Sequence, residues 1–200
     1  IKPMSVINES RDTTHYSIVD SEGNAVSNTY TLGYSFGSGV TIPGTGILMN
    51  NQMNNFAYRY GDSTVDGRAA SPANRFEAGK RPMSTMTPTM VFNQAGELML
   101  VTGSPGGSFI PAAVLRVVSG VIDFDLNIGE ATMLPRIHKD WPYSGLDHES
   151  ILSSDIARQL GIMGHKPKSQ KTMGSTQSIH IKKGINYGYA DLRRPGAGVS

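Results

Sequence analysis

The sequence predicts an α+β fold, because strand-like, helix-like and again strand-like segments follow one another along its 200 residues. From Thr13 on, polar and apolar side chains alternate up to a turn at 21–24, and a returning strand runs from Ala25 to Leu32, which is typical of a β-hairpin. From Ile110 to Val121, apolar residues recur every three or four positions, which is the period of a helix. This order favours layered strands and helices over a doubly wound sheet.

The other elements are justified by the same signals. Pro111 stands in the first turn of the expected helix, where proline is tolerated, and Asn127 with Glu130 has the spacing of a capping box before a second helix. Further strands are expected at 90–92, 98–102, 178–181 and 187–190, a third helix at 149–160 ending near Gly161 or Gly164, an extended arm at 1–12, a glycine-rich loop at 33–55 and a long polar loop at 56–80.

Composition excludes several classes of protein. The chain has no cysteine, so disulfides, cysteine–zinc sites and cysteine nucleophiles are excluded. The net charge is only +2 and the basic residues are scattered along the chain, which does not suit a surface that binds nucleic acid. No apolar run has membrane length, no signal peptide is recognised at the start, and the five histidines show no metal-ligand spacing, so we expect no membrane span, cofactor or metal. Charged residues are only 17%, which hints at a surface covered by another chain, although a Gly/Thr-rich β-protein gives the same number.

A glycine pair in Gly103-Ser-Pro-Gly-Gly-Ser108 joins an expected strand to the helix. Two glycines at a helix start let backbone N–H groups approach a ligand, and the helix dipole favours negative charge there. The segment therefore predicts an anion site or an oxyanion hole, or else only a tight turn that requires glycine. It is neither a P-loop nor the G-x-S-x-G elbow of α/β-hydrolases.

The pair Thr13-Thr14 opens the first strand. A threonine hydroxyl is a poor nucleophile unless an adjacent base activates it, and an N-terminal α-amine can be that base because its pKa lies near neutrality. Two threonines in a strand are also explained by β-propensity alone.

Taken together, six segments resemble the small subunit of the γ-glutamyltransferase (glutathione hydrolase) family. In family order they are 13–20, 23–32, 50–53, 80–89, 102–108 and 173–179. The resemblance implies an N-terminal nucleophile hydrolase with an αββα sandwich, completed by a large subunit that is not in this chain. A precursor of this family cuts itself before the first threonine of Thr-Thr-His, which divides this chain into 1–12, an arm or large-subunit tail, and 13–200, the small catalytic subunit. The freed threonine attacks γ-glutamyl amides such as glutathione, and the acyl group passes to water or to an amino acid.

The resemblance also assigns roles to single residues. They are Thr13 as nucleophile with its own amine as base, Thr31 as its support, Gly106 and Gly107 as oxyanion donors, Ser84 and Thr85 as the pair that grips the donor carboxylate, and Gln52 in the donor pocket. The arginine that clamps this carboxylate in the family belongs to the large subunit. By analogy with the family we expect a periplasmic or secreted protein.

Two positions depart from the family pattern and keep other functions open. Asn55 stands where the family has an acidic residue that pairs with the donor's α-ammonium, and Gly33 stands where many members have asparagine. A neutral amide offers no charge-assisted hydrogen bond, which weakens ammonium recognition by roughly 1–3 kcal/mol. This favours a glutaryl or cephalosporin acylase as an alternative. The residues before Thr13 leave a second alternative, an uncleaved, non-catalytic binding protein.

Overall fold

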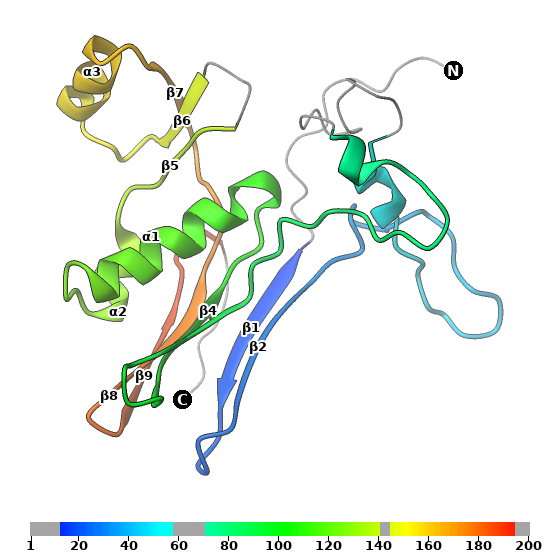
Figure 1. The fold of residues 1–200 in the computed structure, drawn as a ribbon, viewed down its shortest axis with the longest axis horizontal. Coiled ribbons are helices and arrows are strands. Elements are labelled where there is room, and N and C mark those ends of the chain that lie inside the picture. Colours follow the sequence, from blue (N-terminus) through cyan, green and yellow to red (C-terminus); the bar gives the residue numbers. More distant parts are fainter. Residues whose placement is uncertain (1–12, 58–70, 141–144, 195–200) are drawn as a thin grey trace.

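The computed structural model describes residues 13–57, 71–140 and 145–194. The expected arm at 1–12 and a large part of the polar loop at 56–80 lie outside these residues. The described part contains three sheets (Figure 1), and the first four strands of the chain agree with the sequence prediction within a few residues. These are β1 (Thr14–Val19), β2 (Ala25–Tyr30), β3 (Thr89–Phe92) and β4 (Leu98–Gly103).

The predicted hairpin forms, with β1 and β2 paired antiparallel from Thr14 opposite Tyr30 to Val19 opposite Ala25. Its turn is closed by Asp20, whose carboxylate accepts hydrogen bonds from the backbone amides of Glu22 and Asn24. The register of the hairpin places the residue before β1 across from the residue after β2. This matters because those residues are Thr13 and Thr31.

A four-stranded antiparallel sheet in the order β3-β4-β8-β9 packs against the hairpin. In this sheet β8 is Gln177–Lys182 and β9 is Ile185–Ala190. The hairpin docks on it through side-chain hydroxyls: Ser17 donates to the carbonyl of Gln177 at 2.8 Å, and Ser27 donates to that of Thr102 at 2.9 Å. Close packing of two sheets is the central feature of the αββα sandwich that the resemblance implies.

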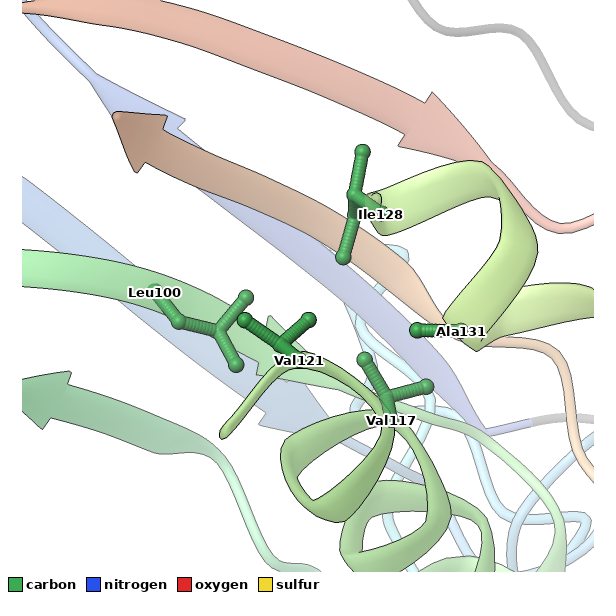
Figure 2. Packing of buried hydrophobic residues seen from close by; sticks show 5 residues of the cluster. All are labelled: Leu100, Val117, Val121, Ile128 and Ala131. Carbon is green, nitrogen blue, oxygen red and sulfur yellow. The ribbon is translucent and has the colours of Figure 1, made fainter. Parts of the chain in front are cut away.

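Two helices cover the other face of the four-stranded sheet (Figure 1): α1 (Ile110–Ile122) and α2 (Ile128–Met133). The capping box at Asn127 and Glu130 is present as predicted. The core between helices and sheet is apolar (Figure 2) and consists of Leu100, Val117, Val121, Ile128 and Ala131. This packing holds α1 on the sheet, and Ile110 and Ala113 in its first turn are also buried, so the glycine pair before the helix is fixed beside the end of β4.

The third sheet was not predicted. Its strands β5 (Ile137–His138), β6 (Gly145–Glu149) and β7 (Lys166–Gln170) pair in that order, and α3 (Ser154–Ile162) connects the parallel strands β6 and β7. The helix expected at 149–160 therefore has the wrong start. Glu149 ends β6 with its side chain buried, and the helix begins only after Ser153, whose hydroxyl accepts from the amide of Ile156.

The described residues also contain three short 3₁₀ helices that lie in or beside predicted site segments. They are η1 (Gln52–Asn55), η2 (Pro72–Asn74) and η3 (Gly107–Phe109). Of the helices within the described ranges, none combines the length and the apolar character that crossing a bilayer needs.

Candidate active site

The hairpin brings the two predicted threonines together. Thr13 is 7% exposed and precedes β1, and Thr31 follows β2 directly across the antiparallel register. The hydroxyl of Thr31 accepts a hydrogen bond from the backbone amide of Gly33 at 2.9 Å. Its own proton then remains for donation to another acceptor, which suits a residue that supports a neighbouring hydroxyl.

The glycine pair forms the turn between β4 and α1. Gly106 and Gly107 have φ values of +137° and +57°, a backbone region that other residues rarely adopt. The carbonyl of Gly106 accepts from the amide of Phe109 at 3.0 Å, and the carbonyl of Gly107 accepts from the hydroxyl of Thr85 at 2.8 Å. Within the described part of the chain, neither glycine amide donates a hydrogen bond, so both remain as donors for a ligand oxygen.

His15 connects the nucleophile strand to the strand that leads into the glycine pair. A Cβ placed on Gly103 would overlap the imidazole of His15, so the ring packs directly on the end of β4. Thr13 lies two residues before His15, and Gly106 lies three residues after Gly103. The start of β1, which follows Thr13, and the end of β4, which leads to Gly106, therefore lie at the same end of the sandwich (Figure 1).

The imidazole of His15 is neutral and satisfied. Ser17 uses its proton to bond the carbonyl of Gln177, so the Nε2–H of His15 donates to Ser17 at 3.1 Å and its Nδ1 accepts from the hydroxyl of Thr29 at 2.6 Å. Burial lowers the pKa of the His15 imidazole to about 4. His15, in the strand that follows the predicted nucleophile, is thus a packing group and not a base near neutral pH.

This buried histidine predicts acid sensitivity. In the unfolded chain His15 takes up its proton near pH 6.5, but in the folded chain only near pH 4. Between these values the unfolded state binds more protons, so the free energy of unfolding should fall as the pH is lowered, by up to about 3 kcal/mol. Urea denaturation of the precursor at pH 7 and pH 4 measures the slope. His15→Asn should flatten it, whereas His165→Asn, outside the packed sheets, should not; an unchanged slope in His15→Asn would contradict the assignment.

The donor-pocket residues form a chain of hydrogen bonds that ends at Thr31. The side-chain amide of Asn55 donates to Oε1 of Gln52 at 2.7 Å, and Nε2 of Gln52 reaches the carbonyl of Thr31 at 3.5 Å. Gln52 and Asn55 thus lie beside the threonine pair. The two side chains that the resemblance places in the donor pocket also contact each other.

Asn74 links this pocket to Ser84 and Thr85, the pair predicted to bind the donor carboxylate. This role of Asn74 was not predicted from the sequence. Its buried side chain donates to the carbonyl of Asn55 at 2.7 Å and accepts from the amide of Met83 at 2.9 Å. Met83 precedes Ser84, whose hydroxyl accepts from the amide of Met86, and Thr85, which bonds Gly107. Nothing local in the polar loop marks Asn74, because its partners are distant in sequence.

Gly33 has a neighbour that fills the space of its missing side chain. Its φ is +95°, and a Cβ there would overlap Oδ1 of Asn51, which also accepts from the amide of Tyr34 at 3.2 Å. A larger residue at 33 would require Asn51 to move. Asn51 therefore occupies the space of the asparagine side chain that the resemblance leads us to expect on residue 33.

A buried cluster of four charged side chains was also missed. Arg136 bonds Asp191 at 2.6 Å, and Arg193 bonds both Asp191 and the two carboxylate oxygens of Glu149. Burial alone would raise the pKa of Asp191, but the two guanidinium groups and the amides of Arg193 and Thr176 outweigh it and hold the pKa below its usual value. Arginines and carboxylates at 136, 149, 191 and 193 show no pattern in the sequence, because three separate segments contribute them.

The described residues contain no group of three or more histidine, aspartate or glutamate side chains placed to hold a metal ion. The arrangement instead offers a buried threonine hydroxyl, a second threonine beside it and two free backbone amides. Such a set suits attack on a carbonyl group by an activated hydroxyl, with the developing negative charge held by backbone N–H groups.

Comparison with known proteins agrees with this geometry. The family model described as Gamma-glutamyltranspeptidase matches residues 2–200. The glutathione hydrolase proenzyme of Escherichia coli (strain K12) is 46% identical over 186 residues, which cover 92% of this chain and 32% of the relative. The chain therefore spans about a third of that proenzyme.

Solved structures show the same fold. A mutant γ-glutamyltranspeptidase of Helicobacter pylori superposes with a TM-score of 0.85 at 41% identity, covering 90% of this chain and 100% of the other. A cephalosporin acylase of Bacillus halodurans gives a TM-score of 0.75 at 29% identity, covering 90% of this chain and 32% of the other. The predicted N-terminal nucleophile hydrolase fold is confirmed. The chain belongs to the γ-glutamyltranspeptidase family.

Proposed function

We propose that this chain is the nucleophile-bearing part of a γ-glutamyl hydrolase and transferase. The observation that carries the proposal is the pairing of Thr13 with Thr31 at the end of the sandwich where the free amides of Gly106 and Gly107 lie. Relatives named glutathione hydrolase proenzyme support the choice of a γ-glutamyl donor.

In this proposal the reaction has two steps. The α-amine of Thr13 takes the hydroxyl proton as the oxygen attacks the γ-carbonyl of the donor, and the amides of Gly106 and Gly107 hold the oxyanion. The proton then passes to the leaving amine, and an ester forms between Thr13 and the γ-glutamyl group. Water or the amine of an amino acid attacks this ester and gives a proton to the α-amine, which passes it to the departing Oγ of Thr13, so that the acid or new amide is released and the threonine hydroxyl is restored.

The proposed enzyme has two subunits cut from one precursor. The first relatives are proenzymes and are about three times as long as the match to this chain, which supports a large subunit that precedes Thr13. That subunit would supply the cation for the donor carboxylate beside Ser84 and Thr85. We propose a periplasmic or secreted location by family analogy.

The test is to express the complete precursor and follow its maturation. We expect Thr13 as the N-terminal residue of the smaller product, and hydrolysis of a γ-glutamyl anilide by the purified two-chain protein. A protein that stays uncleaved between Asp12 and Thr13 and hydrolyses no anilide would instead be the non-catalytic precursor-like binding protein.

A glutaryl or cephalosporin acylase is the second candidate, because Asn55 is neutral and already uses its amide group to bond Gln52. A donor without an α-amine leaves no ammonium unpaired beside this amide. The likeness to a cephalosporin acylase structure shows that the fold serves such an enzyme. Comparing the turnover of γ-glutamyl and glutaryl anilides by the same preparation separates the two functions.

Asn55→Asp should shift specificity toward γ-glutamyl donors. The new carboxylate would accept from Nε2 of Gln52 after the Gln52 amide turns this group away from the Thr31 carbonyl, and it would offer a charge-assisted bond to an α-ammonium. A glutaryl donor would face a carboxylate that it cannot pair. The ratio of kcat/KM for the two donors should move about tenfold, or about 1.4 kcal/mol. Asn54→Asp adds the same charge one residue away and should leave the ratio near its original value. A ratio that moves equally in both variants would show that Asn55 does not contact the α-position.

A further inference from the structure

Ser104 is fully buried beside the glycine pair, and its hydroxyl makes two hydrogen bonds in opposite directions. It donates to the carbonyl of Pro105 at 2.6 Å and accepts from the backbone amide of Ser175 at 2.9 Å. It therefore connects the segment Met173–Thr176 to the peptide that joins Pro105 to Gly106. None of the roles assigned above uses this hydroxyl.

The geometry of a peptide bond makes this contact directional. In a planar trans peptide the C=O and the N–H point to opposite sides, so the direction of one fixes the direction of the other. The bond from Ser104 holds the Pro105 carbonyl toward the Ser104 hydroxyl and the backbone of Gly174, and so it points the Gly106 N–H away from both. The next peptide is held in the same way, because the amide of Phe109 bonds the carbonyl of Gly106 and thereby orients the Gly107 N–H.

The segment that receives Ser104 is itself rigidly held by the buried charge cluster. Glu149 accepts from the amide of Met173 at 2.9 Å, and Arg136 donates to the carbonyl of Met173 at 2.7 Å. At the other end Asp191 accepts from the amide of Thr176 at 2.9 Å, and its own amide donates to the carbonyl of Thr176 at 3.1 Å. Both ends of the segment are thus fixed by groups that are almost completely removed from water.

Close packing leaves the segment no freedom to move away from Ser104. Gly174 has a φ of +71°, and a Cβ there would lie 2.7 Å from the Ser104 hydroxyl and 3.1 Å from the carbonyl of Pro105. Only glycine brings the backbone this near. Segment 173–179 resembles the family, but the resemblance assigned no role to it. The close contact of Gly174 with Ser104 and Pro105 gives a structural reason for the glycine in this segment.

We propose that Ser104 is a positioning residue that aims the Gly106 amide at the oxyanion, with the clamped segment Met173–Thr176 as its fixed support. This inference rests on the proposed function, in which the Gly106 amide binds the oxyanion. The charge cluster then acts on catalysis without touching the substrate. Loss of the Ser104 hydroxyl should weaken binding of the transition state more than binding of the donor.

Ser104→Ala in the complete, matured enzyme tests the proposal, with Ser178→Ala as matched control. Ser178 is 3% exposed, lies in the adjacent strand β8 and bonds the hydroxyl of Thr102 at 2.7 Å, so the same atom is removed from an equally buried site. For Ser104→Ala we expect kcat to fall about tenfold with KM within twofold. A boronic acid analogue of the donor, which forms a tetrahedral adduct, should lose affinity by a similar factor. Ser178→Ala should keep both values.

Ser104→Cys provides a second variant, because it keeps a donor on the same side-chain position with a thiol that is slightly larger and a weaker donor. Its kcat should lie between those of the wild type and Ser104→Ala, and it replaces Ser104→Ala if that variant does not mature. Wild-type kcat in the Ser104 variants, or a loss in KM alone, would overturn the inference. Absence of donor turnover in the unaltered enzyme would overturn the proposed function and this inference with it, so the two failures are distinguishable.

Discussion

Thr13→Ala should leave the precursor uncleaved and the protein without γ-glutamyl hydrolysis. Without the hydroxyl no oxygen is present to attack the carbonyl of residue 12, and no ester with the donor can form. We expect activity to fall by on the order of 10⁴-fold or more, the scale seen when a nucleophile is removed. Gel electrophoresis and N-terminal sequencing measure cleavage, and release of anilide measures turnover.

Thr14→Ala is the matched control for this prediction. It removes the same group from the next residue, whose exposed side chain points to the opposite face of the hairpin from buried Thr13. This variant should mature and hydrolyse the donor. Thr13→Ser should also mature, because it keeps a hydroxyl at the same position. A cleaved and active Thr13→Ala protein would refute the assignment of the nucleophile.

Elements specified by local signals were predicted correctly. The hairpin follows from alternation around the turn at 21–24, and α2 follows from the capping box at Asn127 and Glu130. The third sheet was missed because its strands, with sequences Gly-Leu-Asp-His-Glu and Lys-Pro-Lys-Ser-Gln, have few apolar residues to alternate. Their pairing depends on partners across α3. Glu149 was placed in a helix because a glutamate shows no local sign that distant arginines will bury it.

The candidate site shows the same division. Single motifs identified Thr13 and the glycine pair as chemically interesting, but each motif also had a purely structural explanation. The pairing of Thr13 with Thr31 follows from the register of a hairpin that the sequence predicts, but the register itself was not predicted. The contact of Thr85 with Gly107, and the link from Asn55 through Asn74, join loops that are 19 to 22 residues apart. Such contacts depend on the packed fold, so no local pattern encodes them.

Gly107→Val should lower kcat by about 10²- to 10³-fold, because it displaces one of the two oxyanion donors. At a φ of +57° a β-branched residue is strained, so the backbone of residue 107 must rotate and its N–H must turn with it. The same rotation pulls the carbonyl of Gly107 from the hydroxyl of Thr85. Since the donor is held by other groups as well, we expect the loss mainly in kcat and less in KM, measured with a γ-glutamyl anilide on the matured enzyme.

The control for this prediction is Gly184→Val, in the turn between β8 and β9. Gly184 has a φ of +74° and nothing within 4 Å of an added Cβ, so valine there has the same backbone strain without a neighbour to displace. Both variants should therefore lose thermal stability, but only Gly107→Val should lose kcat. If Gly107→Val keeps its kcat, or if Gly184→Val loses as much, the Gly107 amide does not bind the oxyanion. A selective loss of kcat in Gly107→Val, with Gly184→Val unaffected, separates the chemistry of that amide from the cost of a strained turn.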